Sequence, residues 1–292
     1  MNKIKIRKNY HLGKFTTFKI GGPAEYFCMP VNLDEIIQAL NFARQKGIDR
    51  FIMGGGANLL IADSGYRGLI ISVKKLDKAV FRGCNIDAEA GISIDNINKK
   101  IMKKSLTGME FSGGLPGSLG GAIYMNAKAY GGDFAGVVEY VDAVNENLEC
   151  ERLTGDQLEF SYKASVFMKR KELFIYKAGL ALNKGNKKEI KNKYKNNADD
   201  RKNKGQFHYP SAGCIFKNNY DIGIPTGKII EELGLKGTRI GNAEVYEKHG
   251  NFIINKGDAK ASDVLQLIEK IEKSVYEKKG IKLDREVRLL GF

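Results

Sequence analysis

Long apolar stretches are missing from this sequence of 292 residues. No apolar run approaches the roughly 18 residues that a helix needs to span a bilayer. The first ten residues alternate lysine, arginine and isoleucine, and no apolar stretch followed by small residues is found there, so they do not resemble a secretory signal. We therefore expect a soluble protein of the cytoplasm that has no membrane partner.

Paired cysteines and clustered histidines are also missing. The four cysteines are widely scattered, at Cys28, Cys84, Cys150 and Cys214. None belongs to a CxxC pair, which argues against a disulfide scaffold or a zinc site and favours free thiols. The three histidines form no HxxxH or HExxH pattern, so no metal site is expected.

Acidic residues are too few to balance the basic ones, and the formal net charge is +14. The lysines are densest from Lys184 to Lys204, where Tyr194 is the one tyrosine and no RNA-recognition or finger motif occurs. A solvated helical face explains such a run best. Attraction of anionic small molecules is the next alternative, ahead of nucleic-acid binding. We expect no nucleic-acid partner.

The first third of the chain reads as a small α/β unit. Alternating apolar residues predict a strand over 27–31, and Asn32 with Glu35 predicts a capping box at the start of a helix that Gly47 ends. Short strands are expected over 51–53 and 69–73.

From about Leu76 the pattern changes to short strands and glycine-rich turns, interrupted by one helix that begins near Ser93. Strands are expected over 137–144 and 173–182, and a connecting helix over 184–204. A helix over 262–279 with Gly280 at its C-cap closes the pattern. This order of expected strands and helices indicates a mixed α/β, or α+β, fold.

Two glycine-rich segments are the main candidates for ligand binding: GGGANLL over 54–60 and GGLPGSLGGA over 113–122. Glycine lets backbone amides approach a phosphate closely and point several N–H donors at it. Neither segment is a P-loop or a clean GxGxxG motif, and a glycine turn on its own is more often structural. Composition and spacing alone therefore indicate only an α/β protein with possible nucleotide loops.

Several motifs in the same order resemble those of the UDP-N-acetylenolpyruvoylglucosamine reductase family of peptidoglycan precursor synthesis. They are TFKIGGPA over 17–24, the two glycine segments with YMNA and AYGG after the second, YPSAGCIFKN over 209–218, HGNFIIN over 249–255, and EVR over 286–288. The resemblance extends from about residue 10 to residue 292. The short length of the chain and its direct linker are similar to those of the family subclass that lacks an extra substrate-binding loop.

The resemblance implies a two-part FAD-binding region of the vanillyl-alcohol-oxidase-like kind and a C-terminal α/β substrate domain. The expected domains are 1–75 and 76–190 for FAD and 191–292 for the substrate. It further implies noncovalent FAD, NADPH as hydride donor, a UDP-sugar substrate and a monomer. The implied cofactor-binding residues are Gly54, Gly55, Gly56, Ala57, Asn58, Leu59, Gly114, Gly117, Ser118, Gly120, Gly121, Ala122 and Asn126.

The same resemblance implies three catalytic residues, two of which depart from the family pattern. Cys214 stands where the family has a proton-donating serine, and Lys163 stands where it has an arginine that binds the substrate carboxylate. Glu286 matches the second acid. The implied substrate-binding residues are Tyr162, Lys217 and Asn218.

Further departures leave alternatives open. Lys128, Phe207 and Tyr246 replace a usual glycine, proline and serine. A divergent paralogue with the same flavin fold and another substrate therefore remains an alternative, as does a basic binding protein that has lost catalysis. His249 is expected to serve structure rather than catalysis.

Overall fold

A computed structural model describes residues 3–292 and divides them into two compact units. The first unit contains residues 3–7, Phe27–Gly55 and Gly68–Asp200. The second contains Lys8–Tyr26, Gly56–Arg67 and Arg201–Phe292. Residues 1 and 2 of the N-terminal segment considered above lie outside the described part. The predicted division into three domains stays a prediction.

The α/β part has a four-stranded sheet of order β1-β2-β5-β3, in which β3 and β5 run parallel. Its elements are β1 (Arg7–His11), β2 (Pro23–Cys28), α1 (Leu33–Lys46), β3 (Arg50–Met53) and β5 (Tyr66–Ser72). The predicted strand over 27–31 is misplaced, because β2 begins at Pro23 and ends at Cys28. The strands expected over 51–53 and 69–73 are present as β3 and β5.

Helix α1 begins and ends where the sequence predicts. The Asn32 side chain accepts the Glu35 N–H at 2.9 Å, and Gly47 closes the helix in the left-handed conformation at φ 60°. The other half of the capping box is displaced by one residue, since the Glu35 carboxylate accepts the N–H of Val31 at 3.0 Å rather than that of Asn32.

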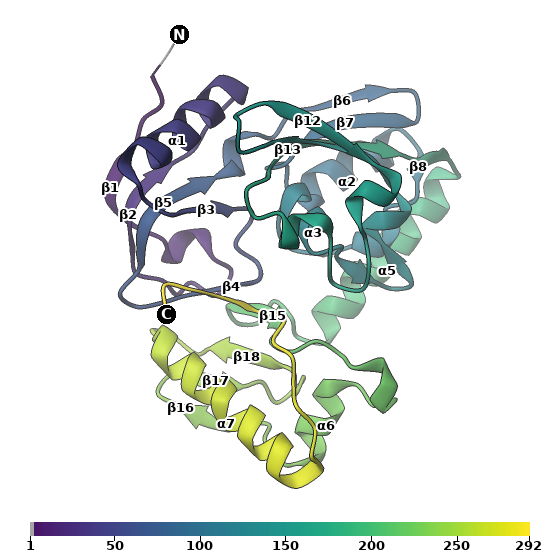
Figure 1. Ribbon diagram of the computed structural model, residues 1–292. Helices are drawn as coiled ribbons and strands as arrows, with labels where there is room; N and C mark the ends of the chain where they lie inside the picture. The colour runs from purple at the N-terminus through teal and green to yellow at the C-terminus, as the bar shows by residue number, and fades with distance from the viewer. Residues whose placement is uncertain (1–2) are drawn as a thin grey trace. The chain divides into compact units, whose positions relative to one another are not determined.

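A five-stranded antiparallel sheet of order β12-β11-β13-β7-β6 forms the larger part of the first unit (Figure 1). Its strands are β6 (Ala79–Arg82), β7 (Asn85–Glu89), β11 (Val138–Val144), β12 (Cys150–Thr154) and β13 (Phe174–Ala181). Two small ribbons accompany it: β8 (Leu106–Thr107) with β14 (Asn183–Lys184), and β9 (Lys128–Ala129) with β10 (Gly132–Asp133).

Three helices rather than the expected single one interrupt these strands. Helix α2 (Ile94–Lys103) is the predicted one, and the Ser93 side chain caps it. Helices α3 (Leu119–Tyr124) and α4 (Val166–Lys169) have six and four residues. The single-helix prediction is wrong because helices this short show no amphipathic period, and the two glycines of α3 disfavour a helix. All three helices contribute side chains to the core against the sheet.

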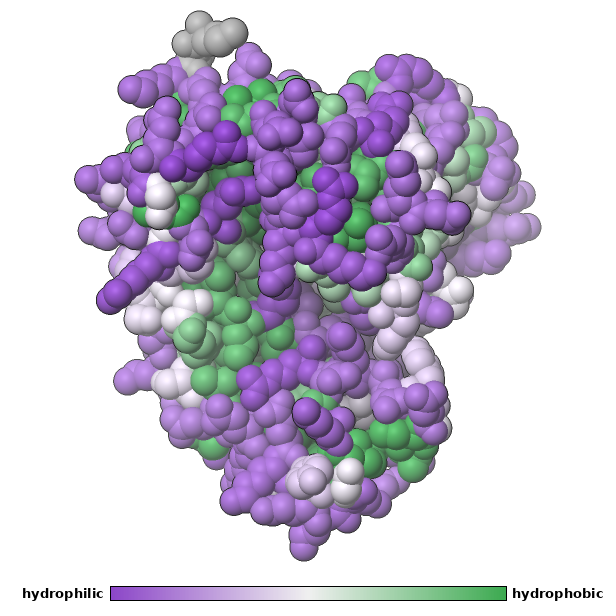
Figure 2. All heavy atoms as spheres, viewed as in Figure 1, coloured by the Kyte–Doolittle hydropathy of each residue, from purple (hydrophilic) through white to green (hydrophobic). Residues whose placement is uncertain are grey.

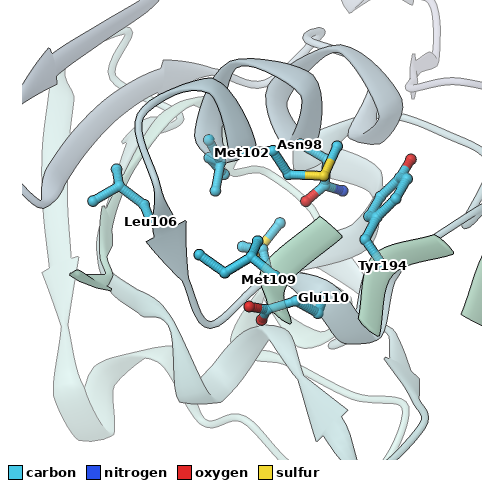
Figure 3. Close-up of a pocket in the computed structure, with 8 residues that line it drawn as sticks. Asn98, Met102, Leu106, Met109, Glu110 and Tyr194 are labelled. Atoms are coloured by element: carbon cyan, nitrogen blue, oxygen red, sulfur yellow. The ribbon is translucent and has the colours of Figure 1, made fainter. Parts of the chain in front are cut away.

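The lysine-rich segment forms α5 (Lys187–Asn203), which packs on α2 by one face (Figure 3). Tyr194 points toward Asn98 and Met102 of α2, and its hydroxyl donates to Asp95 at 3.1 Å. The pocket that Asn98 and Met102 of α2 line together with Leu106, Met109, Glu110 and Tyr194 has about 0 Å³ of space for water. The lysines are therefore carried by a helix that is anchored to the first unit along its length up to Asp200.

The second unit is an antiparallel sheet of order β15-β18-β17-β16 covered by α7 (Figure 1). The predicted C-terminal helix and its Gly280 cap are confirmed. The elements are β4 (Leu59–Ile61), β15 (Ser211–Cys214), α6 (Thr226–Glu232), β16 (Arg239–Ile240), β17 (Ala243–Val245), β18 (Phe252–Asn255), α7 (Ala261–Lys279) and β19 (Arg288–Leu290).

Early and late parts of the chain share the core of this second unit. Phe18, Ile20 and Leu60 are buried in one cluster with the apolar stripe of α7. The amide of Asn255 also donates to the Phe18 carbonyl at 3.1 Å. The TFKIGGPA motif is therefore a structural partner of the C-terminal sheet.

The visible face of the molecule is mostly hydrophilic, with smaller apolar areas between charged side chains (Figure 2). Within residues 3–292, no helix combines the length and the apolar character needed to cross a membrane.

Candidate functional site

The two glycine-rich segments meet in the first unit. Gly54 and Gly55 follow β3 and lie against the turn before α3. A Cβ atom on Gly55 would lie 2.5 Å from the Cα of Gly117, and one on Gly54 would lie 2.6 Å from the Oγ of Ser118. Only glycine permits this approach of one backbone to another. Segments about 60 residues apart in sequence thus form one backbone-lined surface.

This surface offers backbone donors. Within the described residues 3–292, the N–H groups of Gly117 and Ser118 donate to no protein acceptor. Gly114 and Gly117 have φ values of 68° and 114°, a region that favours glycine and turns successive amides toward one side. The Ser118 side chain accepts the Gly121 N–H at 3.4 Å and caps α3. Such a group of amides suits a diphosphate.

Two of the implied cofactor residues, Gly120 and Ala122, have packing contacts within the protein. The Gly120 N–H donates to the Ala90 carbonyl at 2.8 Å, and a Cβ on Gly120 would lie 2.7 Å from the Cβ of Ala90. Ala122 is 7% exposed and belongs to the core of the sheet. Gly120 is thus required by the contact with Ala90, and its amide is already used.

Asn126 is also engaged within the protein. Its side chain is 3% exposed, donates to the Ser161 carbonyl at 3.0 Å and accepts the Ala135 N–H at 2.9 Å. The backbone takes a φ of 39° there. These bonds fix the turn that carries Tyr162 and Lys163.

That turn is a tight hairpin. Ser161 and Ala164 exchange backbone hydrogen bonds of 3.1 and 3.3 Å, which leaves Tyr162 and Lys163 at the tip. Lys163 has a φ of 55°, in the left-handed region. A lysine in that region is uncommon, and the two-residue turn accounts for it here.

In the second unit, the end of the first glycine segment joins the C-terminal EVR motif. Strand β4 runs parallel to β19, with Leu59 opposite Arg288. The Asn58 side-chain amide donates to the Glu286 carbonyl at 2.9 Å, and the Arg288 N–H donates to the Asn58 carbonyl at 3.0 Å. At Gly56, φ is 67° and a Cβ would overlap the carbonyl of Phe15.

Cys214 lies at the end of β15, beside the same motif. Its strand is irregular between Ser211 and Cys214, and Gly213 has a φ of 75°. The Cys214 side chain is half-buried and packs against Tyr246, Phe252 and Ile254. A bulge of this kind redirects a side chain out of the regular alternation of the strand.

Glu286 is held next to the residue that follows Cys214. The N–H groups of Glu286 and Val287 both donate to the Ile215 carbonyl, at 2.7 and 3.2 Å. The structure therefore brings Cys214, Glu286 and Asn58 together from three distant segments of the chain.

Buried Asn251 holds the loop after Cys214, and sequence reasoning did not single it out. It is 2% exposed, accepts the Phe216 N–H at 2.9 Å and donates to the Phe216 carbonyl at 2.7 Å. Its place in the HGNFIIN motif was the available signal. The motif thus contributes the support of the loop rather than a reactive group.

Removal of that support has a predictable cost. We expect Asn251→Ala to lower the free energy of unfolding by roughly 2–3 kcal/mol, because it leaves a buried N–H and a buried carbonyl without partners. Urea denaturation followed by circular dichroism measures this. Asn242→Ala, at an exposed position of the same unit, is the control and should change stability by no more than about 0.5 kcal/mol. Equal small effects of both changes would disprove the supporting role.

The implied substrate residues Lys217 and Asn218 follow Phe216 directly. The Asn218 side chain accepts the N–H of Thr226 at 3.0 Å, and the Thr226 hydroxyl donates to the Lys217 carbonyl at 2.7 Å. Asn218 therefore fixes the start of α6. The Lys217 side chain is half-buried at this loop.

Two neighbouring side chains have shifted acidities. Burial and then Tyr209 raise the pKa of Tyr246, whose hydroxyl lies 2.9 Å from His208 Nδ1. Burial, followed by the charge of Lys204, lowers the pKa of His249. Because His249 is thereby kept neutral, its environment agrees with the expected structural role.

Metal chemistry has no evident ligands. Among residues 3–292, no group of three or more His, Cys, Asp or Glu side chains is placed to hold a metal ion. The four cysteines are free thiols.

Comparison with protein families covers most of the chain. The FAD-binding domain model matches residues 24–154, and the model for the C-terminal domain of UDP-N-acetylenolpyruvoylglucosamine reductase matches residues 205–290. The UDP-N-acetylenolpyruvoylglucosamine reductase of Caldanaerobacter subterraneus is 43% identical over 98% of this chain and 94% of its own. That of Clostridium novyi is 39% identical over 100% and 94%.

Solved structures agree with these sequence relatives. The UDP-N-acetylenolpyruvylglucosamine reductase of Thermus caldophilus matches with a TM-score of 0.82 and 28% identity, over 99% of both chains. A solvent-stable cholesterol oxidase matches more weakly, with a TM-score of 0.50 and 14% identity over 61% of this chain and 38% of its own. The second match concerns the fold alone and agrees with the expected vanillyl-alcohol-oxidase-like flavin-binding architecture.

Proposed function

Because this chain belongs to the UDP-N-acetylenolpyruvoylglucosamine reductase family, we propose that it reduces UDP-N-acetylglucosamine enolpyruvate to UDP-N-acetylmuramate with NADPH and FAD. It is an oxidoreductase of peptidoglycan precursor synthesis. The observation that carries this conclusion is the match of relatives about 40% identical over nearly the whole chain. The comparisons favour it over the divergent paralogue and the basic binding protein considered above.

The glycine surface of the first unit fits the diphosphate of FAD. The amides of Gly117 and Ser118 supply donors, and Gly54 and Gly55 leave no Cβ above them. We propose that these residues, together with Gly114 and Gly121 of the same unit, bind FAD noncovalently. When bound, FAD supplies the hydride that NADPH has delivered to it.

Cys214 and Glu286 are proposed to handle the proton. Reduction of the enolpyruvyl double bond needs one proton at the carbon next to the carboxylate. The Cys214 thiol is the proposed donor, and it must regain a proton from solvent in each turnover. Glu286, held beside it through Ile215, is proposed to stabilise the enol form by hydrogen bonding.

Lys163 is proposed to bind the substrate carboxylate, where charge accumulates during the reaction. We expect Lys163→Met to lower kcat/KM for the sugar nucleotide by about 100-fold, because a cation is lost where negative charge develops. Lys163→Arg should retain or raise activity, since a guanidinium grips a carboxylate with two bonds. Initial rates at varied substrate concentration measure both.

The control for this prediction is Lys171→Met, which removes an exposed lysine of the same unit. It should leave kcat/KM unchanged. Equal losses in Lys163→Met and Lys171→Met would show that the net charge of the unit matters and would contradict a specific role for Lys163.

The overall function has a direct test. The purified protein should be yellow, and NADPH oxidation under anaerobic conditions should proceed beyond one turnover only when the enolpyruvyl sugar nucleotide is added. Flavin reduction by NADPH without any turnover of the sugar nucleotide would refute the proposed substrate. We further propose that the enzyme acts as a cytoplasmic monomer without a nucleic-acid partner, since its substrates are small soluble metabolites; light scattering tests the monomer.

A further inference from the structure

A second concave site lies in the first unit, apart from every residue assigned above. It is a cavity of about 360 Å³, open to solvent, between the N-terminal segment, the end of β2 and the turn after β5. Lys3, Lys5 and Arg7 line one side of it, and Lys75 lines another. Its size is within the range of small-molecule sites in proteins.

The N-terminal side of the cavity is built by alternation. Within residues 3–7, Ile4 is 8% exposed, whereas Lys3, Lys5 and Arg7 are exposed. The Ile4 N–H donates to the Gln38 side chain of α1 at 2.9 Å, which anchors the segment. The alternation of basic and apolar residues seen in the sequence therefore places three cations on one wall.

These cations outnumber the acids near them. Lys3, Lys5 and Lys75 form no ion pair with any carboxylate among residues 3–292. The one acid in the lining, Glu35, uses its carboxylate to accept the Val31 N–H at 3.0 Å. Lys3, Lys5 and Lys75 against this one carboxylate give the lining a net positive charge of about two without counting Arg7, which favours a multiply charged anion.

The floor of the cavity is apolar. Phe27 and Cys28 are each 1% exposed, and Met29 and Val31 are half-buried beside them. Burial, followed by the charge of Glu35, raises the pKa of Cys28 to about 12, so that the thiol stays neutral. An apolar floor under cationic walls suits a ligand that joins a flat apolar group to charged oxygens.

We propose that this cavity is a binding site for a nucleoside phosphate, separate from the flavin and from the reacting substrate. The phosphates lie among Lys3, Lys5 and Lys75, and the base covers the apolar floor near Val31. Part of the lysine excess, which the reductase chemistry does not use, thereby has a function.

The test uses the FAD-loaded protein and two probes, ADP and inorganic pyrophosphate, with calorimetry as the measurement. ADP should bind more tightly than pyrophosphate because only ADP covers the floor. Lys5→Glu/Lys75→Glu should lower the affinities for ADP and for pyrophosphate by at least about 30-fold, since each change removes a charged contact. Val31→Trp should lower the affinity for ADP by about 10-fold or more, because the larger side chain fills the space above the apolar floor. The affinity for pyrophosphate should change by no more than about 2-fold.

The matched control is Lys188→Glu/Lys191→Glu on α5, which makes the same change in net charge at exposed positions of the same unit. It should alter ADP binding by less than about 3-fold at physiological salt. Equal losses in the two double variants would show general electrostatic attraction and overturn the site. ADP binding that disappears when FAD is loaded would place the ligand in the flavin site and overturn it as well.

The proposed reductase activity and the proposed nucleoside phosphate site can be tested independently. The variants Lys5→Glu/Lys75→Glu and Val31→Trp should keep the rate of sugar-nucleotide reduction, since they change no residue of the reaction. Cys214→Ala should still bind ADP at this cavity. Loss of both the activity and ADP binding in a lysine variant whose thermal denaturation is unchanged would overturn a separate site.

Discussion

Replacing Cys214 with alanine is expected to slow the reoxidation of reduced flavin by the sugar nucleotide by roughly 100- to 10,000-fold, the range lost with a general acid. Reduction of the flavin by NADPH should change by less than about 2-fold, because that half-reaction takes no proton from the thiol. Stopped-flow absorbance under anaerobic conditions measures the two half-reactions separately.

The geometry supports this difference between the half-reactions. Cys214 packs on Tyr246, Phe252 and Ile254 and lies next to the carbonyl of Ile215 that holds Glu286. It has no part in the glycine surface of the first unit, which is proposed to bind FAD. Loss of the thiol should therefore leave flavin content unchanged.

A matched control and a conservative variant sharpen the test. Cys150→Ala removes an exposed thiol of the first unit and should leave both half-reactions intact. Cys214→Ser introduces the proton-donating serine that the family resemblance implies for this position and should keep substantial activity. An equal loss of both half-reactions in Cys214→Ala would indicate damaged flavin binding and would contradict the proton-donor role.

The thiol also makes the enzyme sensitive in a way that a serine would not. A thiol ionises near pH 8.5, far below an alcohol, and its thiolate is readily alkylated and oxidised. Iodoacetamide or peroxide should therefore inactivate the wild-type protein, and Cys214→Ser should resist both. Full activity after complete modification of Cys214 would rule out the assigned role.

The sequence predicted the long elements well and the short ones poorly. Helices α1 and α7 have apolar stripes and Gly47 or Gly280 at their ends, so local signals suffice to place them. Helix α3 depends instead on the Ser118 cap and on contact with the Ala90 region. A six-residue helix with two glycines is stable only through such tertiary contacts, which periodicity does not report.

The candidate site was similarly predictable in part. The motifs put forward Cys214, Glu286 and both glycine segments as site residues, and the structure brings the two glycine segments together. They did not separate residues that bind from residues that support. Gly120, Asn126 and Asn251 use their polar groups inside the protein, and only the fold reveals partners such as Ala90, Ser161 and Phe216.

Gly55→Ala is the change expected to affect the flavin most. The added Cβ would lie 2.5 Å from the Cα of Gly117, 2.8 Å from its carbonyl carbon and 2.9 Å from the Ser118 nitrogen. All three are backbone atoms, so no side-chain rotation relieves the overlap. The two segments must separate at the amides proposed to hold the diphosphate. Overpacking of this kind costs roughly 1–3 kcal/mol.

If that cost falls on the bound state, FAD affinity should drop by about 5- to 150-fold. Titration of the apoprotein with FAD, followed by flavin fluorescence, measures the loss. Gly136→Ala is the control, because its added Cβ would meet nothing closer than 3.8 Å. Unchanged FAD affinity in Gly55→Ala would mean that the glycine contact has no part in flavin binding.

Gly54 permits a rescue that Gly55 does not. Its added Cβ would lie 2.6 Å from the Ser118 Oγ, a side-chain atom, while the next atoms are 3.5 Å away. Ser118→Ala deletes that oxygen, so Gly54→Ala/Ser118→Ala should regain FAD affinity relative to Gly54→Ala. Gly55→Ala/Ser118→Ala should regain none, because its overlap is with backbone. Rescue of both, or of neither, would contradict a site defined by the close approach of these two backbones.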